Sequence, residues 1–375
     1  MRTCGIAFPP RRSARTSASS SRRRGSGSAT PSSRSFRICA RPSGGSVASS
    51  ASEPSAGHEG RARLSRAFRV AGLLGGALLL IALVPSDAWA WTPGTHILLS
   101  EAVLRAGAAL PQSVAALLQA FPYDFLYGSI AADTSIAKKY AAPGRHCHAW
   151  HVGLEIHEAA RDEPLRAFAL GYLTHLAADV VAHNWFVPRQ LAVASRTAGL
   201  GHSYWESRFE AHLGEGLGRR AREVILLDHA RSDELLDRVL SPTIFSTATN
   251  RRIFRGMVYV TDTESWQRVF KVAKEMSRHD LPDPVVGAYT RYAYDYVMDL
   301  LVRLDRSEPF RHDPSGEEPL RLAKRIRRET LGIRGGGVDA LLEEAERHFA
   351  MPQSALDYAE RAGGLIPARA TPEAG

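Results

Sequence analysis

The sequence predicts an all-α protein, a bundle of many helices, and three observations lead to this fold class. From Trp91 onward, apolar residues recur mainly at the three- and four-residue spacing of a helix. Alternating strand patterns are scarce, and no internal repeat is found. Several residues that can ligate metals also recur at the four-residue spacing of a helix. We therefore expect a helical domain over 91–310 and a helical C-terminal extension over 311–375.

The helical spacing can be followed in order along the chain. It covers 97–110, 113–121, 153–162, 165–186, 203–217, 233–240, 251–262, 265–278, 285–306, 318–332 and 338–349. Residues 307–319 are rich in turn formers and predict a linker or a long turn before a charged helical tail. The tyrosine-rich stretch 288–297 could face a membrane interface, although packed core with polar tips is the more ordinary interpretation.

The first 90 residues differ in composition from the rest. Residues 1–60 are rich in Ser, Arg, Gly and Ala, so we expect a disordered leader, or a stretch that is not translated because Met1 is not the true start. Residues 61–90 combine a basic start, a 15-residue apolar run and Ala88-Trp89-Ala90. This pattern predicts a signal peptide cleaved after Ala90 and a periplasmic or extracellular protein. An uncleaved anchor is the alternative, but the run is short for a membrane span.

Charge and cysteine content narrow the function classes. Residues 1–90 hold 14 Lys and Arg against 3 acidic residues, which leaves 34 basic and 36 acidic residues in 91–375. The positive net charge therefore belongs to the leader, and the body gives no strong signal for nucleic-acid binding. Only Cys147 remains after the predicted cleavage, so no intrachain disulfide can form.

One apolar stretch, 171–185, carries three potential metal ligands. His175, Asp179 and His183 follow one another at four-residue intervals. Positions i, i+4 and i+8 drift by only about 80° around a helix, so the three side chains share one face. Burying them together is costly unless a partner compensates, and a divalent metal is the simplest partner. The alternative is a set of core histidines held by Asp179 and by backbone carbonyls.

Other potential ligands lie within the same part of the chain. Of the 13 histidines after residue 90, nine fall between residues 96 and 212. The further candidates are the helix-spaced pair His202 and Glu206, the isolated Asp133, and a cluster of His146, His148 and His151 in which His148 is favoured. Nitrogen and oxygen ligands of this kind suit zinc best, with manganese or iron as alternatives.

Cleavage after Ala90 would create one more ligand. Trp91 would then carry a free α-amine, which a metal can bind at neutral pH, and its own carbonyl would close a chelate. His96 follows five residues later, within reach of the same ion. The alternative is that Trp91 is simply an aromatic core residue.

Together, these motifs resemble a known family. WTPGTH, YGSIAADT, RHCHAWH, H-x-x-x-D-x-x-x-H and H-x-x-x-E occur in the order found in zinc-dependent phospholipase C proteins, a superfamily that includes the N-terminal domain of glycosylphosphatidylinositol-specific phospholipase D and the fungal single-strand nucleases. The resemblance covers about 91–215. It implies an all-α bundle around a site of up to three zinc ions.

The resemblance also implies which residues hold each ion. Asp133, His148, His175 and Asp179 would hold one zinc; His183, His202 and Glu206 a second; Trp91, His96 and a bridging Asp179 a third. Asp133 would in addition be catalytic, orienting or deprotonating the attacking water. The chain departs from the secreted phospholipases just after Trp91, where Thr92, Pro93 and Gly94 replace an acidic residue near the head group. Choline selectivity is therefore not predicted.

These expectations define a predicted function and its alternatives. We expect an exported zinc-dependent phosphodiesterase of the phospholipase C type, in which metal-activated water hydrolyses phospholipids or other phosphodiesters. A membrane surface would be a further partner. The alternatives are a single-strand nuclease or nucleotidase of the same fold, and a non-catalytic zinc-stabilised binding protein.

Overall fold

The structure is a computed structural model, and it describes residues 91–194, 198–263, 268, 270–272, 275, 277, 279–332 and 336–364. The chain divides into two units, Met1–Ala62 and Arg63–Gly375, and all described residues belong to the second unit. The predicted leader and signal peptide lie outside the described residues, as do the last eleven residues. Part of the predicted helix 265–278 also lies outside them.

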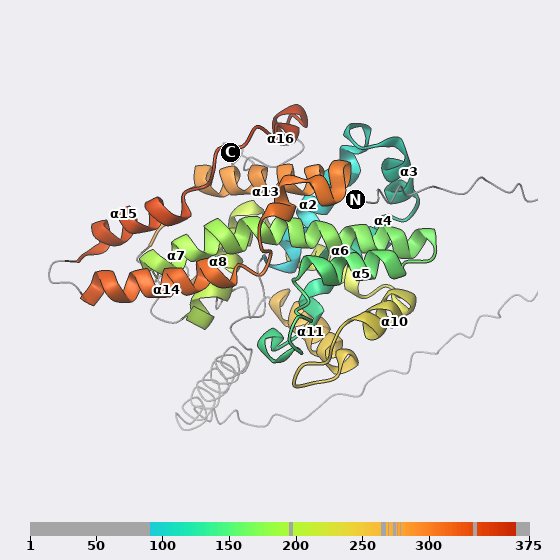
Figure 1. Ribbon diagram of the computed structural model, residues 1–375, viewed down its shortest axis with the longest axis horizontal. Helices are drawn as coiled ribbons and strands as arrows, with labels where there is room; N and C mark the ends of the chain where they lie inside the picture. Colours follow the sequence, from blue (N-terminus) through green and yellow to red (C-terminus); the bar gives the residue numbers. More distant parts are fainter. Residues whose placement is uncertain are drawn as a thin grey trace, which may run out of the picture. The chain divides into compact units, whose positions relative to one another are not determined.

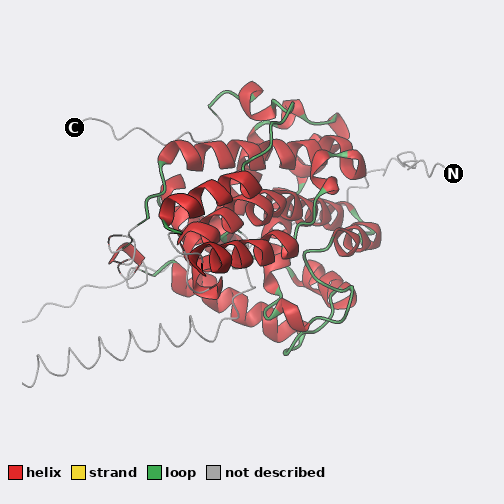
Figure 2. Ribbon diagram, turned by 60° about the vertical axis from the view of Figure 1, so that its left-hand side comes forward, coloured by secondary structure: helices red, strands yellow, loops and turns green. Residues whose placement is uncertain are grey.

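The described part of the chain is helical and contains no strand, which confirms the predicted all-α class (Figure 2). Its α-helices are α2 (Pro93–Arg105), α3 (Gln112–Ala120), α4 (Pro122–Ala131), α5 (Trp150–Ala159), α6 (Glu163–Val181), α7 (Val187–Ala194), α8 (Ala198–Leu213), α9 (Leu217–Ile225), α10 (Ala230–Val239), α11 (Thr247–Thr261), α13 (Asp283–Arg303), α14 (Glu317–Gly332), α15 (Val338–Phe349) and α16 (Tyr358–Arg361). Short 3₁₀ turns and one π-helical turn, Ala182–Phe186, join several of them.

Helix α6 lies at the centre of the bundle, with α4, α5 and α13 packed around it (Figure 1). Asp162 caps its N-terminus by accepting the backbone N–H of Leu165, and almost all residues of α6 from Leu165 onward are buried. Gly128 of α4 and Gly171 of α6 face each other so closely that a Cβ on either would overlap the backbone of the other helix. This contact brings the end of α4, and the turn with Asp133 after it, to the ligand-bearing face of α6.

One helical stretch among the described residues, Glu163–Ala194, has the length and apolar composition of a membrane span. In the fold, 94% of its most apolar window is buried against other parts of the chain. The apolar character of this stretch is therefore used for packing inside the bundle.

The second long helix, α13, carries the tyrosine-rich stretch. Tyr289, Tyr292, Tyr294 and Tyr296 are all at most 8% exposed, which supports the packed-core interpretation. The segment after α13 is a turn that packs on the bundle. The indole of Trp150 donates to the His312 carbonyl at 2.9 Å, and Gly316, at φ +58°, leaves no space for a Cβ beside His183.

Candidate metal centre

Four of the predicted ligands meet at one buried point. Asp133 follows α4, His148 precedes α5, and His175 and Asp179 lie on α6. The Nε2 atoms of His148 and His175 are 3.0 Å apart and lie 2.8 and 3.1 Å from Asp179 Oδ2. They also lie 3.5 and 3.9 Å from Asp133 Oδ1. All four side chains are almost completely buried.

These separations fit a zinc ion. Ligand atoms about 2.0–2.1 Å from a tetrahedral zinc lie about 3.3 Å from one another, which is within the observed range. Asp133 Oδ2 and both oxygens of Asp179 are buried without a hydrogen-bond partner, although imidazole nitrogens surround Asp179. These three oxygens have no donor, and a cation at the point where the side chains meet would compensate their burial.

A third imidazole, that of His96, approaches the other carboxylate oxygen of Asp179. His96 Nε2 of α2 lies 3.3 Å from Asp179 Oδ1 and has no hydrogen-bond partner among the described residues, whereas His148 and His175 approach Oδ2. The two carboxylate oxygens thus face two different sets of nitrogens, as a bridging ligand would. Burial, followed by the nearby His175, lowers the pKa of His96 to about 4, so its ring is neutral and able to ligate.

Trp91 lies beside this set. Its side chain is fully buried, stacks on Phe186 with ring centroids 5.2 Å apart, and donates its indole N–H to the carbonyl of Ala178 at 3.0 Å. This carbonyl belongs to the residue before Asp179, so the indole of Trp91 packs against the part of α6 that carries Asp179. The indole is therefore an aromatic core residue, while ligation by the amine and carbonyl of Trp91 stays a prediction.

The second predicted set also comes together. His183, His202 and Glu206 each offer a ligand atom within 4.8 Å of the others, and all three side chains are buried. His202 Nε2 lies 2.7 Å from Glu206 Oε1, yet neither atom has hydrogen-bond geometry. Burial raises the pKa of Glu206 and lowers that of His202, which means that the pair lacks a compensating charge. A divalent cation would supply it.

The other ring nitrogens of these histidines are held in place. His175 Nδ1 lies 2.9 Å from the Ser129 carbonyl, and His183 Nδ1 lies 2.6 Å from the Pro314 carbonyl. Both contacts place a proton on Nδ1 and leave Nε2 as the ligand atom, which is the usual arrangement of metal-bound histidines. The π-helical turn Ala182–Phe186 contains His183, and such turns are frequent at functional sites.

The structure distinguishes the three clustered histidines. His148 is fully buried within the first ligand set, as favoured from the sequence. His146 accepts the backbone N–H of His148 through Nδ1 at 3.1 Å, and His151 contacts the Gly144 carbonyl instead. His148 Nδ1 lies 3.2 Å from the Cys147 sulfur.

One participant could not be expected from the sequence, namely Lys138. Its ammonium is 2% exposed and lies 2.8 Å from Asp133 Oδ1 and 3.1 Å from His148 Nε2. Burial alone would raise the pKa of Asp133, but Lys138 and the two imidazoles outweigh it and hold that pKa well below its usual range. A lysine in the second of two adjacent turns, five residues after an acid, carries no recognisable spacing signal.

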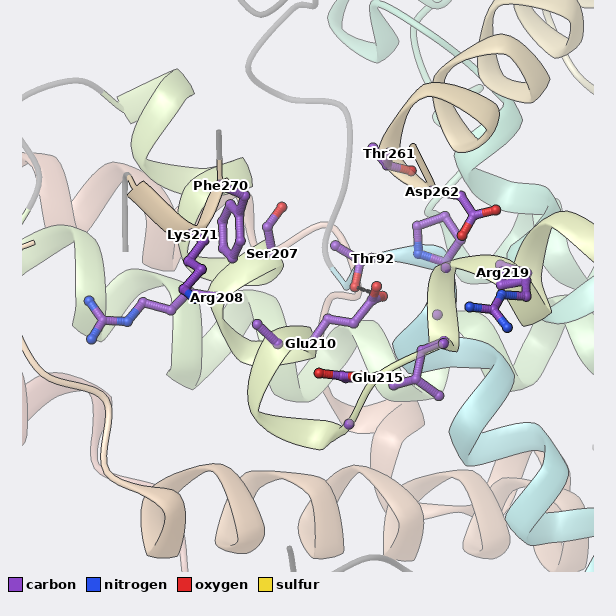
Figure 3. Close-up of a pocket in the computed structure, with 18 of the residues that line it drawn as sticks. Thr92, Ser207, Arg208, Glu210, Glu215, Arg219, Thr261, Asp262, Phe270 and Lys271 are labelled. Carbon is purple, nitrogen blue, oxygen red and sulfur yellow. Dashed lines mark hydrogen bonds between the residues drawn. The ribbon is translucent and has the colours of Figure 1, made fainter. Parts of the chain in front are cut away.

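An open cleft adjoins the start of α2. It has a volume of about 1120 Å³ and is bounded by the N-terminal turn, the end of α8, the start of α9 and the end of α11 (Figure 3). Its lining includes Thr92, Pro93 and Gly94 but none of the predicted ligands. Glu210 of α8 also lines it and accepts a hydrogen bond from the hydroxyl of Thr92.

Residues 95–249 match the family model described as zinc dependent phospholipase C. No curated protein matches the chain significantly, and no solved structure does. The matched segment begins two residues after the start of α2 and contains every predicted ligand except Trp91. This part of the chain is therefore a zinc-dependent phospholipase C family domain, which confirms the resemblance found in the sequence.

Proposed function

We propose that the chain is an exported zinc-dependent phosphodiesterase that hydrolyses phospholipids in the manner of a phospholipase C. One observation carries this proposal. Buried ligand atoms of two adjacent sets, the oxygens of Asp179 in one and His202 with Glu206 in the other, converge without hydrogen-bond partners inside the segment that matches the family model. The rings of His148 and His183, one from each set, have centroids 6.1 Å apart, so one phosphate group could reach both sets.

The side chains have separate tasks in this proposal. Zinc bound at the site would lower the pKa of a water and stabilise the charge on phosphate oxygens. Asp133 has one carboxylate oxygen engaged by Lys138 and the other without a partner, so it can accept a hydrogen bond from the attacking water. The ion pair with Lys138 disfavours removal of a proton by Asp133. Orientation of the water is therefore the better supported of its two predicted roles.

Export completes the proposed site. Cleavage after Ala90 would free the amine of Trp91, whose indole is already fixed beside Asp179. The amine, the Trp91 carbonyl, His96 and Asp179 would then hold a third zinc, and the processed chain would carry up to three. A phospholipid surface, reached outside the cytoplasm, would be the partner of this enzyme.

The test uses the chain processed to begin at Trp91. We expect up to three zinc ions by native mass spectrometry and release of the phosphorylated head group from phospholipid vesicles, lost with a chelator and restored by zinc. The variant His202→Ala should lose zinc and activity. His212→Ala is the matched control, because His212 lies on the same helix but pairs with Asp283 at 2.7 Å.

Other outcomes would favour the alternatives. Hydrolysis of single-stranded DNA without hydrolysis of phospholipid would favour the nuclease. Full zinc loading with no hydrolysis of either substrate would favour a zinc-stabilised binding protein. Full activity of His202→Ala would overturn the assignment of the second ligand set.

A further inference from the structure

We propose that Glu210 is a positioning residue for the third zinc: its carboxylate fixes the turn between Trp91 and His96, and so places both ligands against Asp179. This inference rests on the three-zinc site of the proposed function. Glu210 lies on α8, outside all predicted ligand sets, and no step of the proposed reaction uses it.

The Glu210 carboxylate forms hydrogen bonds with this turn. It accepts a hydrogen bond from the Thr92 hydroxyl, as Figure 3 shows, and hydrogen bonds from the backbone N–H groups of Gly94 and Thr95. Both N–H groups belong to the first turn of α2: that of Thr95 also donates to the Thr92 carbonyl at 2.9 Å, and that of Gly94 lies where the helix itself offers no acceptor. Thr92 stands at the N-cap position but makes no side-chain cap itself. A carboxylate from α8 therefore caps α2, and its negative charge also suits the helix N-terminus.

The first turn of α2 packs tightly against Glu210 and against α9. A Cβ on Gly94 would overlap Glu210 and would also lie against Leu217 of α9. The turn is thus pressed directly onto the carboxylate. A larger residue at position 94, or a shift of the turn, would break these hydrogen bonds.

The residues on either side of this turn, Trp91 and His96, are predicted ligands of the third zinc. Trp91 is anchored by its indole to the Ala178 carbonyl, and His96 Nε2 faces Asp179 Oδ1. The backbone amine of Trp91 has to reach the same point, and its position depends on the path of residues 92–95. Glu210 is the side chain from another helix that holds this path.

Helix α8 also connects the turn to the second ligand set. His202, Glu206 and Glu210 follow at four-residue intervals, so they share one face, and Glu210 lies about 6 Å along the axis from Glu206. The stripe repeats the spacing of His175, Asp179 and His183 on α6. One rigid helix thus sets the distance between the second ligand set and the N-terminal turn.

The test counts zinc in the processed chain that begins at Trp91, by native mass spectrometry, with competition against a chelator to obtain affinities. We expect Glu210→Ala to weaken one zinc of three by about 10–100-fold, the usual effect of removing a residue that orients a metal ligand. The other two zincs should bind as in the unsubstituted chain. Glu210→Gln keeps one acceptor oxygen and should restore most of the affinity.

Two further variants complete the experiment. Glu215→Ala is the matched control, because Glu215 lines the same cleft and is exposed. If Glu210→Ala does not fold, Thr92→Val removes the hydroxyl that contacts Glu210 and the Thr95 hydroxyl but keeps the carboxylate, and it should weaken the same zinc to a smaller extent.

The outcomes separate this inference from the proposed function, since counting zinc needs no substrate. Three zincs of unchanged affinity in Glu210→Ala would overturn the inference, as would an unsubstituted chain that binds fewer than three. Three zincs in the unsubstituted chain, one of them weakened in Glu210→Ala, would support it even if no phospholipid is hydrolysed.

Discussion

The two longest helices, α6 and α13, pack against each other and both bury carboxylates, but they treat them differently. Asp299 of α13 is fully buried and has partners for both oxygens: Arg303 at 2.5 and 2.7 Å, and the backbone N–H of Glu308 at 2.7 Å. Asp179 of α6 is equally buried, but neither oxygen has a hydrogen-bond partner.

The contrast distinguishes an aspartate that is buried for a structural role from one that is buried for a functional role. A buried charge whose hydrogen bonds are all made stabilises one packing arrangement, whereas a buried carboxylate whose oxygens make no hydrogen bond needs a cation. The exposed fraction of the side chain is the same for both aspartates, so burial alone would not distinguish them. The contacts of their oxygens distinguish them, and substitutions in each helix can test the distinction.

The largest effect is expected for Asp179→Asn. The amide keeps the shape but removes the charge that two ligand sets share, so zinc binding at both should fail. We expect hydrolysis of phospholipid to fall by more than about a thousandfold, at the upper end of the effect of removing one electrostatic stabiliser. Head-group release and zinc content measure this. A variant that keeps its zinc and its activity would contradict the functional role assigned to Asp179.

An intermediate effect, on stability alone, is expected for Asp299→Ala. The substitution removes hydrogen bonds to a charged group and should lower the free energy of unfolding by about 1.5–3 kcal/mol. Zinc content should not change, because Asp299 faces Arg303 and the turn after α13. Urea unfolding and zinc analysis measure both quantities. Loss of zinc without loss of stability would contradict the structural role of this carboxylate.

The smallest effect concerns Asp295, one turn earlier on α13, which accepts the backbone N–H of Ala359 at 2.7 Å. Burial raises its pKa from 3.8 to about 6. The folded chain therefore holds this proton more tightly than the unfolded chain, and this contribution to stability is lost as pH rises through about 6. We expect Asp295→Asn to flatten the fall in stability between about pH 4 and 6.

Unfolding at several pH values, with the exposed Asp305→Asn as control, measures the change. The difference between the two variants isolates Asp295 from the other titrating groups. An unchanged pH profile in Asp295→Asn would mean that the raised pKa is not coupled to folding.

Much of the candidate site could be predicted from the chain because helix periodicity is a local property. His175, Asp179 and His183 share a face whatever surrounds them, and the pair His202 and Glu206 does so for the same reason. The third member of the second stripe, Glu210, was readable at the same spacing but is not a ligand of either predicted set. The partners of Asp133 and His183, namely Lys138 and the Pro314 carbonyl, were not predictable, since neither has a periodic relation to its partner.

The sequence by itself determined the helical class, the faces on which the ligands lie and the family of the domain. Each of these depends on residues a few positions apart, where backbone geometry fixes the relation between side chains. Only the tertiary structure decided that the ligand sets converge. It places His96 beside one oxygen of Asp179 and His148 beside the other. It also brings His148 into the first set, whereas His146 and His151 make other contacts. Those relations join residues from separate helices, so they depend on close packing such as that of Gly128 against Gly171, which no local pattern encodes.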